Sequence, residues 1–139
     1  MKVTVDANIL IAALIKGGST RKILTNSAIT VFAPAFLFSE IIKYKREIVK
    51  KSKGSEDDFN YLFAILLKNI KIIDDKELLP YLPAAKTLIS DKKDLLYFAC
   101  ALYKDTVIWS NDKEFKKQKR VKIFTTEEML KEVGAYNNS

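Results

Sequence analysis

Five short runs of apolar and β-branched residues alternate along the chain with segments whose apolar residues have helical spacing. The runs, each predicted to be a strand, cover residues 3–5, 29–33, 70–73, 106–110 and 121–124. Strands that alternate with helices form a mainly parallel sheet with helices on both faces. Because crossovers between parallel strands are right-handed, the strand carboxyl ends lie along one edge, where ligands bind in such folds. The sequence therefore predicts an α/β fold with its functional site at that edge.

Four carboxylates are expected at or near this edge. Asp6 directly follows the first strand, and Asp112 follows the fourth. Asp94 is predicted to cap the apolar helix that follows it, and Glu40 lies near the start of a long helix expected from about residue 35 to 54. Clustered like charges repel one another unless a cation neutralises them, so convergence of these acids would indicate a metal site. Taken singly, each acid also fits a structural role as a cap, a turn residue or an exposed helix residue.

The chain contains no histidine, and this narrows the possible chemistry. Histidine-based triads, histidine acid–base cleavage of RNA and histidine-ligated zinc are all excluded. The single cysteine, Cys100, lies in an apolar run and is predicted to be a buried structural residue. If the protein is a hydrolase, carboxylates must therefore do the work, by holding a hard cation such as Mg²⁺ or Mn²⁺.

Basic residues outnumber acidic ones, 24 to 17, which gives a net charge of +7. They concentrate in two stretches, residues 43–53 and 113–122, and each stretch follows one of the four acids. Solvated surface is the simplest interpretation of any single lysine. Two such stretches support contact with a phosphate backbone, for which we select Lys43, Lys113, Lys116 and Lys117.

The length of 139 residues suits one domain, expected over residues 1–133 with a frayed tail at 134–139. The longest apolar runs are too short to cross a bilayer, and the N-terminus lacks the pattern of a signal peptide. A lone cysteine also suits a reducing compartment. We therefore expect a cytoplasmic protein without a membrane partner.

Four motifs in sequence order resemble those of the PIN domain family, the PilT N-terminus-type ribonucleases that include VapC-type toxins. The first is Val5–Leu10 and the second is Ser39-Glu40. The third is Asp91–Asp94 before the apolar helix, and the fourth is Ile108–Phe115 with its Trp-Ser-Asn-Asp run. The resemblance spans about residues 2 to 130. It departs from many relatives at Lys92-Lys93, where proline is frequent.

This resemblance implies a three-layer α/β/α sandwich and a nuclease that uses Mg²⁺ or Mn²⁺ to cleave phosphodiester bonds in RNA. Matched motif by motif, the metal-binding and catalytic acids are Asp6, Glu40, Asp94 and Asp112. Asn8 and Ser110 match supporting positions, and Asp91 is a neighbour of the site. A toxin role, an antitoxin partner and homo-oligomerisation are further implications of the same resemblance.

Two other functions stay open on the sequence. A PIN-like scaffold that binds RNA or a protein without cleaving it would retain the same fold. An aspartate-based phosphohydrolase would use Asp6 as a phosphate acceptor, but the usual second aspartate of such enzymes is Asn8 here.

Overall fold

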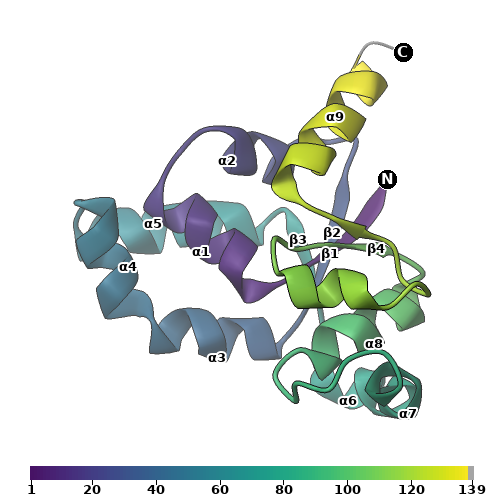
Figure 1. The fold of residues 1–139 in the computed structure, drawn as a ribbon. Coiled ribbons are helices and arrows are strands. Elements are labelled where there is room, and N and C mark those ends of the chain that lie inside the picture. The colour runs from purple at the N-terminus through teal and green to yellow at the C-terminus, as the bar shows by residue number, and fades with distance from the viewer. Residues whose placement is uncertain (138–139) are drawn as a thin grey trace.

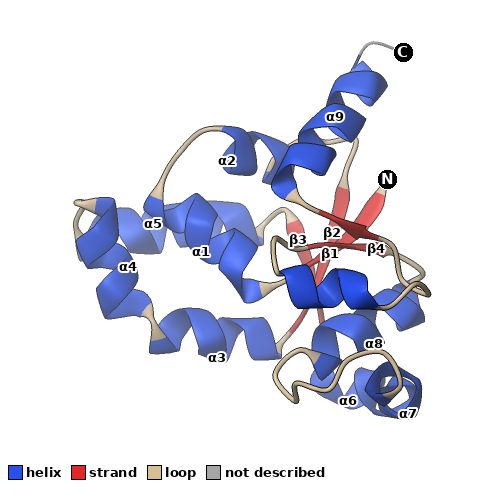
Figure 2. Ribbon diagram, viewed as in Figure 1, coloured by secondary structure: helices blue, strands red, loops and turns tan. Residues whose placement is uncertain are grey.

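A computed structural model describes residues 1–137 of the chain. Its centre is a sheet of five parallel strands in the order β3-β2-β1-β4-β5, coloured red in Figure 2. The strands are β1 (Lys2–Val5), β2 (Thr30–Pro34), β3 (Ile70–Ile73), β4 (Val107–Trp109) and β5 (Ile123–Phe124). Every pair of neighbouring strands is parallel, as the alternating sequence pattern predicts.

Helices cover both faces of the sheet and give three layers, as expected (Figure 1). One buried cluster joins the sheet to α1 (Ala7–Ile15), α2 (Ser19–Leu24), α3 (Phe36–Lys43), α4 (Lys45–Ser52), α5 (Glu56–Leu67) and α9 (Thr126–Asn137). A second cluster joins it to α6 (Asp75–Leu78), α7 (Leu82–Lys86), α8 (Leu95–Lys104) and the 3-10 turn η2 (Lys113–Lys117). A further 3-10 turn, η1 (Leu79–Tyr81), connects α6 to α7.

The central strand β1 shows why both faces must be covered. Val3, Thr4 and Val5 are all fully buried, so side chains on alternate sides of the strand are removed from water. The Thr4 hydroxyl hydrogen-bonds with that of Thr106 at 2.7 Å and donates to the Cys100 Sγ. Cys100 is buried as predicted, and burial raises the pKa of its thiol to about 11.

The long helix expected from about residue 35 to 54 is instead two helices. The chain leaves helical geometry at Tyr44 (φ −100°, ψ 8°), between α3 and α4. The sequence predicts that Gly54 ends this helix, but the second helix ends at Ser52 and Lys53 takes the left-handed conformation (φ 59°), so that prediction is wrong. Ile41 of α3 and Ile48 of α4 are both buried, and α4 packs against α1.

The sequence also predicts a helix from about Ala84 to Ile89, which in the structure begins earlier, at Leu82, and ends at Lys86. It further predicts two capping boxes, Ser55 with Asp58 and Thr125 with Glu128, and both are present. Helix α9 continues to Asn137, and residues 138–139 of the expected frayed tail lie outside the described part of the chain. Within residues 1–137, no helix combines the length and apolarity that crossing a bilayer requires.

Candidate metal-dependent nuclease site

Strands β1 and β4 are neighbours in the sheet, and Val5 pairs with Trp109 at their carboxyl ends. The residues that follow, Asp6 and Ser110, therefore meet. Asp6 is buried, with 5% of its surface exposed, and its Oδ2 accepts a hydrogen bond from the Ser110 hydroxyl. Its Oδ1 accepts the Ile9 N–H at 3.1 Å and caps α1. Asp6 thus fills both of its predicted roles, helix cap and rim carboxylate.

Burial raises the pKa of Asp6, since removing a carboxylate from water disfavours its charged form. The hydrogen bonds from Ser110 and Ile9 oppose this effect, whereas the nearby charge of Asp112 adds to it. Hydrogen bonds therefore stabilise the charged form of Asp6, whereas the negative charge of Asp112 repels it. A cation would relieve that repulsion.

Ser110 connects Asp6 to Asp112. Its Oγ donates to Asp6 and accepts the backbone N–H of Asp112 at 3.1 Å. The carboxylate of Asp112 is exposed and its Oδ1 accepts the Glu114 N–H at 2.9 Å, which caps η2. Ser110 therefore links two of the expected acids from a fully buried position.

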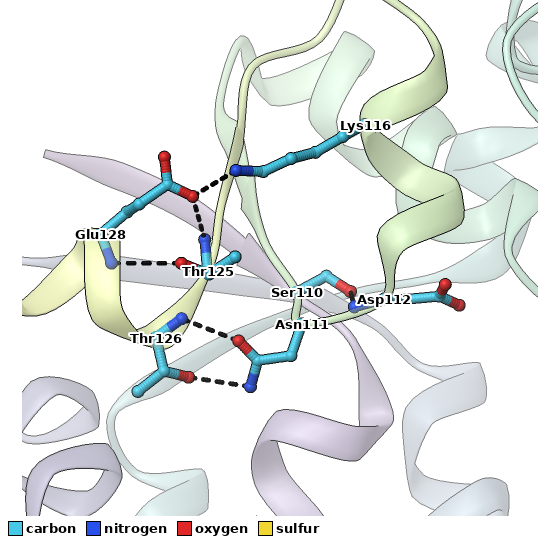
Figure 3. A network of polar contacts seen from close by, with 7 residues as sticks. All are labelled: Ser110, Asn111, Asp112, Lys116, Thr125, Thr126 and Glu128. Atoms are coloured by element: carbon cyan, nitrogen blue, oxygen red, sulfur yellow. Dashed lines mark hydrogen bonds and ion pairs between the residues drawn. The ribbon is translucent and has the colours of Figure 1, made fainter.

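The loop that carries Asp112 is also hydrogen-bonded to the start of α9, as Figure 3 shows. The Asn111 Oδ1 accepts the Thr126 N–H at 2.8 Å, and its Nδ2 donates to the Thr126 Oγ1 at 3.0 Å. The Trp109 Nε1–H donates to the same hydroxyl at 3.0 Å. The first turn of α9 therefore anchors the chain on both sides of Ser110.

Asp94 occupies the N-cap position of α8, as predicted, but its side chain makes no capping hydrogen bond. Its backbone is already helical (φ −92°, ψ −13°), because a turn closed by the Asp91 Oδ1 and the Lys93 N–H at 2.9 Å precedes it. The Asp94 carboxyl is half-buried. Burial, together with the charges of Asp91, Asp112 and Asp6, raises its pKa to about 6. Asp94 thus shares an electrostatic environment with the acids of β1 and β4.

All four expected acids line one cavity of about 350 Å³, namely Asp6, Glu40, Asp94 and Asp112. Asn8 lines it too, with an exposed side chain. Ser110 lies behind Asp6, and Asp91 lies in the turn before Asp94. The cavity therefore gathers carboxylates from four separate segments of the chain.

The donor set of the cavity consists of carboxylate oxygens, which suits a hard divalent cation. Across residues 1–137, no three acids lie close enough together, as their side chains stand, to coordinate one ion. Asp6 and Asp112 are instead turned toward backbone N–H groups. The residues fit a metal by their chemistry and their shared charge, and ion binding would have to draw their side chains together.

Sequence reasoning missed several residues of the cavity. Beside the predicted Glu40, they are Tyr44, Glu47, Ile48 and Lys51, which form one wall with it. Their spacing of four, three, one and three residues places them on one helical face, which is the signal that would have identified them. Lys93 and the buried Tyr97 also line the cavity. Burial, with the charges of Asp6, Glu40 and Asp94, raises the pKa of the Tyr97 hydroxyl.

The four lysines selected for phosphate contact lie outside this lining. The Lys43 ammonium is 5.5 Å from the centre of the Tyr44 ring, which does line the cavity. Lys116 forms an ion pair with Glu128, and Lys117 pairs with Glu114 at 2.7 Å. Lys113 is exposed at the start of η2.

Comparison with solved structures supports the fold. VapBC2 from Rickettsia felis, solved with a promoter DNA fragment, is 22% identical and covers 90% of this chain and 98% of its own (TM-score 0.67). PAE2754 from Pyrobaculum aerophilum is 16% identical, with coverage of 97% and 90% (TM-score 0.69). VapBC-1 from nontypeable Haemophilus influenzae is 16% identical, with coverage of 91% and 99% (TM-score 0.65).

No curated protein sequence matches this chain. The family profile of the PIN domain, in contrast, matches residues 4–134, a span that includes all four acids and every strand except the first two residues of β1. The resemblance carried by the four motifs is thereby confirmed, and the chain belongs to the PIN domain family.

Proposed function

We propose that this protein is a metal-dependent endoribonuclease that hydrolyses phosphodiester bonds in RNA. The observation that carries the proposal is the convergence of Asp6, Glu40, Asp94 and Asp112 on one cavity at the carboxyl edge of the sheet. Membership of the PIN domain family supports it. The basic net charge of +7 suits a polyanionic substrate.

In this proposal Asp6, Asp94 and Asp112 hold Mg²⁺ or Mn²⁺, with Glu40 as a fourth acid on the α3 wall. The ion, when bound, supplies activation of a water molecule and stabilisation of the charge that develops on the phosphate. Ser110 orients Asp6 and Asp112 through its two hydrogen bonds. Asn8 borders the acids at the start of α1.

Cationic side chains would hold the substrate on either side of the acids. Lys51 and Lys93 line the cavity itself. Lys43, Lys113, Lys116 and Lys117 are exposed on neighbouring segments and would bind flanking phosphates. Lys116 and Lys117 would first have to leave Glu128 and Glu114. Such contacts make affinity fall as salt concentration rises.

Replacing Asp6 or Asp94 by asparagine should abolish metal-dependent cleavage of RNA. We expect a loss of more than about 100-fold, beyond the effect of changing a residue that only supports a ligand. The measurement is cleavage of a mixed RNA panel in Mn²⁺, in Mg²⁺ and in EDTA, where EDTA should stop the wild type. Asp57→Asn, a change in the first turn of α5 outside the cavity lining, is the control and should cleave normally.

Full activity of Asp94→Asn, or cleavage in EDTA, would contradict the proposal. RNA binding without cleavage in any metal would favour the non-catalytic module instead. A covalent phosphate on Asp6 would favour the phosphohydrolase.

Asp94→Asn should stabilise the metal-free protein at pH 8. The pKa of Asp94 is about 6 in the folded state against an ordinary value of 3.8. The unfolded chain therefore loses this proton first, and folding is penalised increasingly as pH rises from about 4 to above 6. After discounting for solvent screening at a half-buried group, the gain at pH 8 is about 1–2 kcal/mol.

Urea unfolding in EDTA at pH 8 and at pH 4 measures this effect, which should be small at the lower pH. Adding Mn²⁺ at pH 8 should reverse the order of stability, because only the wild type retains the full set of acids. Lower stability of Asp94→Asn at pH 8 would show that the carboxylate is not repelled in the folded protein.

Asn111→Ala should weaken cleavage by about 10- to 100-fold through loss of the loop geometry at Asp112. The affinity for Mn²⁺, measured by calorimetry, should fall with it. Asn69→Ala removes a comparable asparagine hydrogen bond, to Ile65 O at the end of α5, and should alter neither quantity. Unchanged Mn²⁺ affinity in Asn111→Ala would show that the geometry of this loop does not contribute to metal binding.

We further propose that the nuclease is the toxin of a toxin–antitoxin pair, with an antitoxin that covers the acidic cavity. Solved structures of similar fold include a toxin–antitoxin complex from Klebsiella pneumoniae, 15% identical with a TM-score of 0.64. Induced expression in a bacterial host should arrest growth for the wild type and for Asp57→Asn, but not for Asp94→Asn. Equal growth of all three strains at equal protein levels would argue against a toxin in that host.

A further inference from the structure

The cavity is larger than a metal site requires. Its volume is about 350 Å³, more than ten times the roughly 30 Å³ that one water molecule occupies in the liquid. Volumes of about 300 to 1,000 Å³ are typical of sites that take a small organic molecule. A divalent cation with its waters at the acids therefore leaves most of the cavity unused.

Part of the remaining lining is apolar and aromatic. Beside the acids, the lining includes Ile11 and Ile15 of α1, Phe36 of α3, Ile48 of α4 and Tyr44 between them. Phe36 and Tyr44 are half-buried, so aromatic surface next to the acids stays in contact with water. A phosphodiester alone offers nothing apolar to cover that surface.

The break in the helix places Tyr44 among charged residues of the cavity wall. Glu40 lies four residues before it, and Glu47 and Lys51 lie three and seven residues after it. The Lys43 ammonium is 5.5 Å from the centre of its ring. An aromatic surface with ammonium groups nearby is complementary to a nucleobase and the phosphate attached to the same nucleotide.

We propose that Tyr44 is the stacking platform of a nucleobase subsite, which holds one unpaired base of the RNA beside the scissile phosphodiester. This inference rests on the proposed nuclease function and names the part of the substrate that the cavity takes. Because a base inside a duplex is already stacked on its neighbours, the subsite selects single-stranded RNA. Lys43 and Lys51 hold the phosphates of the stacked nucleotide and its neighbour.

The subsite is tested by a double-mutant cycle. The Tyr44 ring is removed from the protein and one base is removed from the RNA, singly and together. Binding of a short fluorescent RNA is measured by anisotropy in Mg²⁺, in an Asp94→Asn background that prevents cleavage. A single abasic residue is moved along the RNA to find the position where removing the base weakens binding. Tyr44→Leu is then compared with Tyr44 on the intact and the abasic RNA.

The platform predicts that base removal at one position weakens binding by about 5- to 150-fold, and that Tyr44→Leu weakens binding of the intact RNA similarly. On the abasic RNA, Tyr44→Leu should cause no further loss. Tyr44→Phe and Tyr44→Trp should restore binding, since they keep an aromatic face and the core packing. Tyr61→Leu, a change at a tyrosine 72% exposed on α5, should have no effect.

Two results would overturn the subsite. One is equal binding of the intact RNA and every abasic RNA, and the other is independent, additive effects of Tyr44→Leu and base removal. Cleavage by the Asp94-containing protein, measured in parallel, separates the two proposals. Cutting with no dependence on the base refutes the subsite alone, whereas absence of both cutting and binding refutes the nuclease and the subsite together.

Discussion

The site depends on the contact between a buried carboxylate and a buried hydroxyl at the ends of two adjacent strands. Asp6 and Ser110 meet because β1 and β4 are paired in parallel, although 104 residues separate them in the sequence. Burying a carboxylate is costly unless hydrogen bonds compensate it, and here Ser110 and Ile9 supply two. The same hydroxyl then fixes the backbone at Asp112. One strand pairing thus positions two of the four acids.

The other two acids come from helices that the sheet positions less directly. Asp94 follows a tight turn at the start of α8, and its carboxyl makes no capping hydrogen bond. The carboxyl is therefore available to the cavity. Glu40 lies on α3, whose continuation as a straight helix is interrupted at Tyr44. Tyr44 at this interruption and the buried Ile48 beyond it both line the cavity. The same segment therefore contributes to the core and to the cavity wall.

Much of this arrangement could be predicted from the sequence, because the signals are local. The strands are short β-branched runs, the two capping boxes are four-residue patterns, and Asp6 and Asp112 directly follow strands. The placement of the four acids in one cavity also followed from the parallel sheet. Asp94 takes its predicted N-cap position without a capping hydrogen bond, because such a bond depends on the backbone angles at that residue, which the preceding turn sets. Ion pairing of Lys116 with Glu128 depends on α9 folding back toward η2, which no local pattern encodes.

By itself, the sequence determined the α/β class and the exclusion of histidine chemistry, since each depends on local periodicity or on residue type. It also predicted, from strand and helix ends and from the family motifs, the four acids that line the cavity. Tertiary structure alone decided that β4 lies beside β1, that the helix bends at Tyr44 and that Asn111 is held by Thr126. These features depend on which distant segments become neighbours. That choice is made by burial of both sheet faces, a property of the whole fold that no stretch of sequence contains.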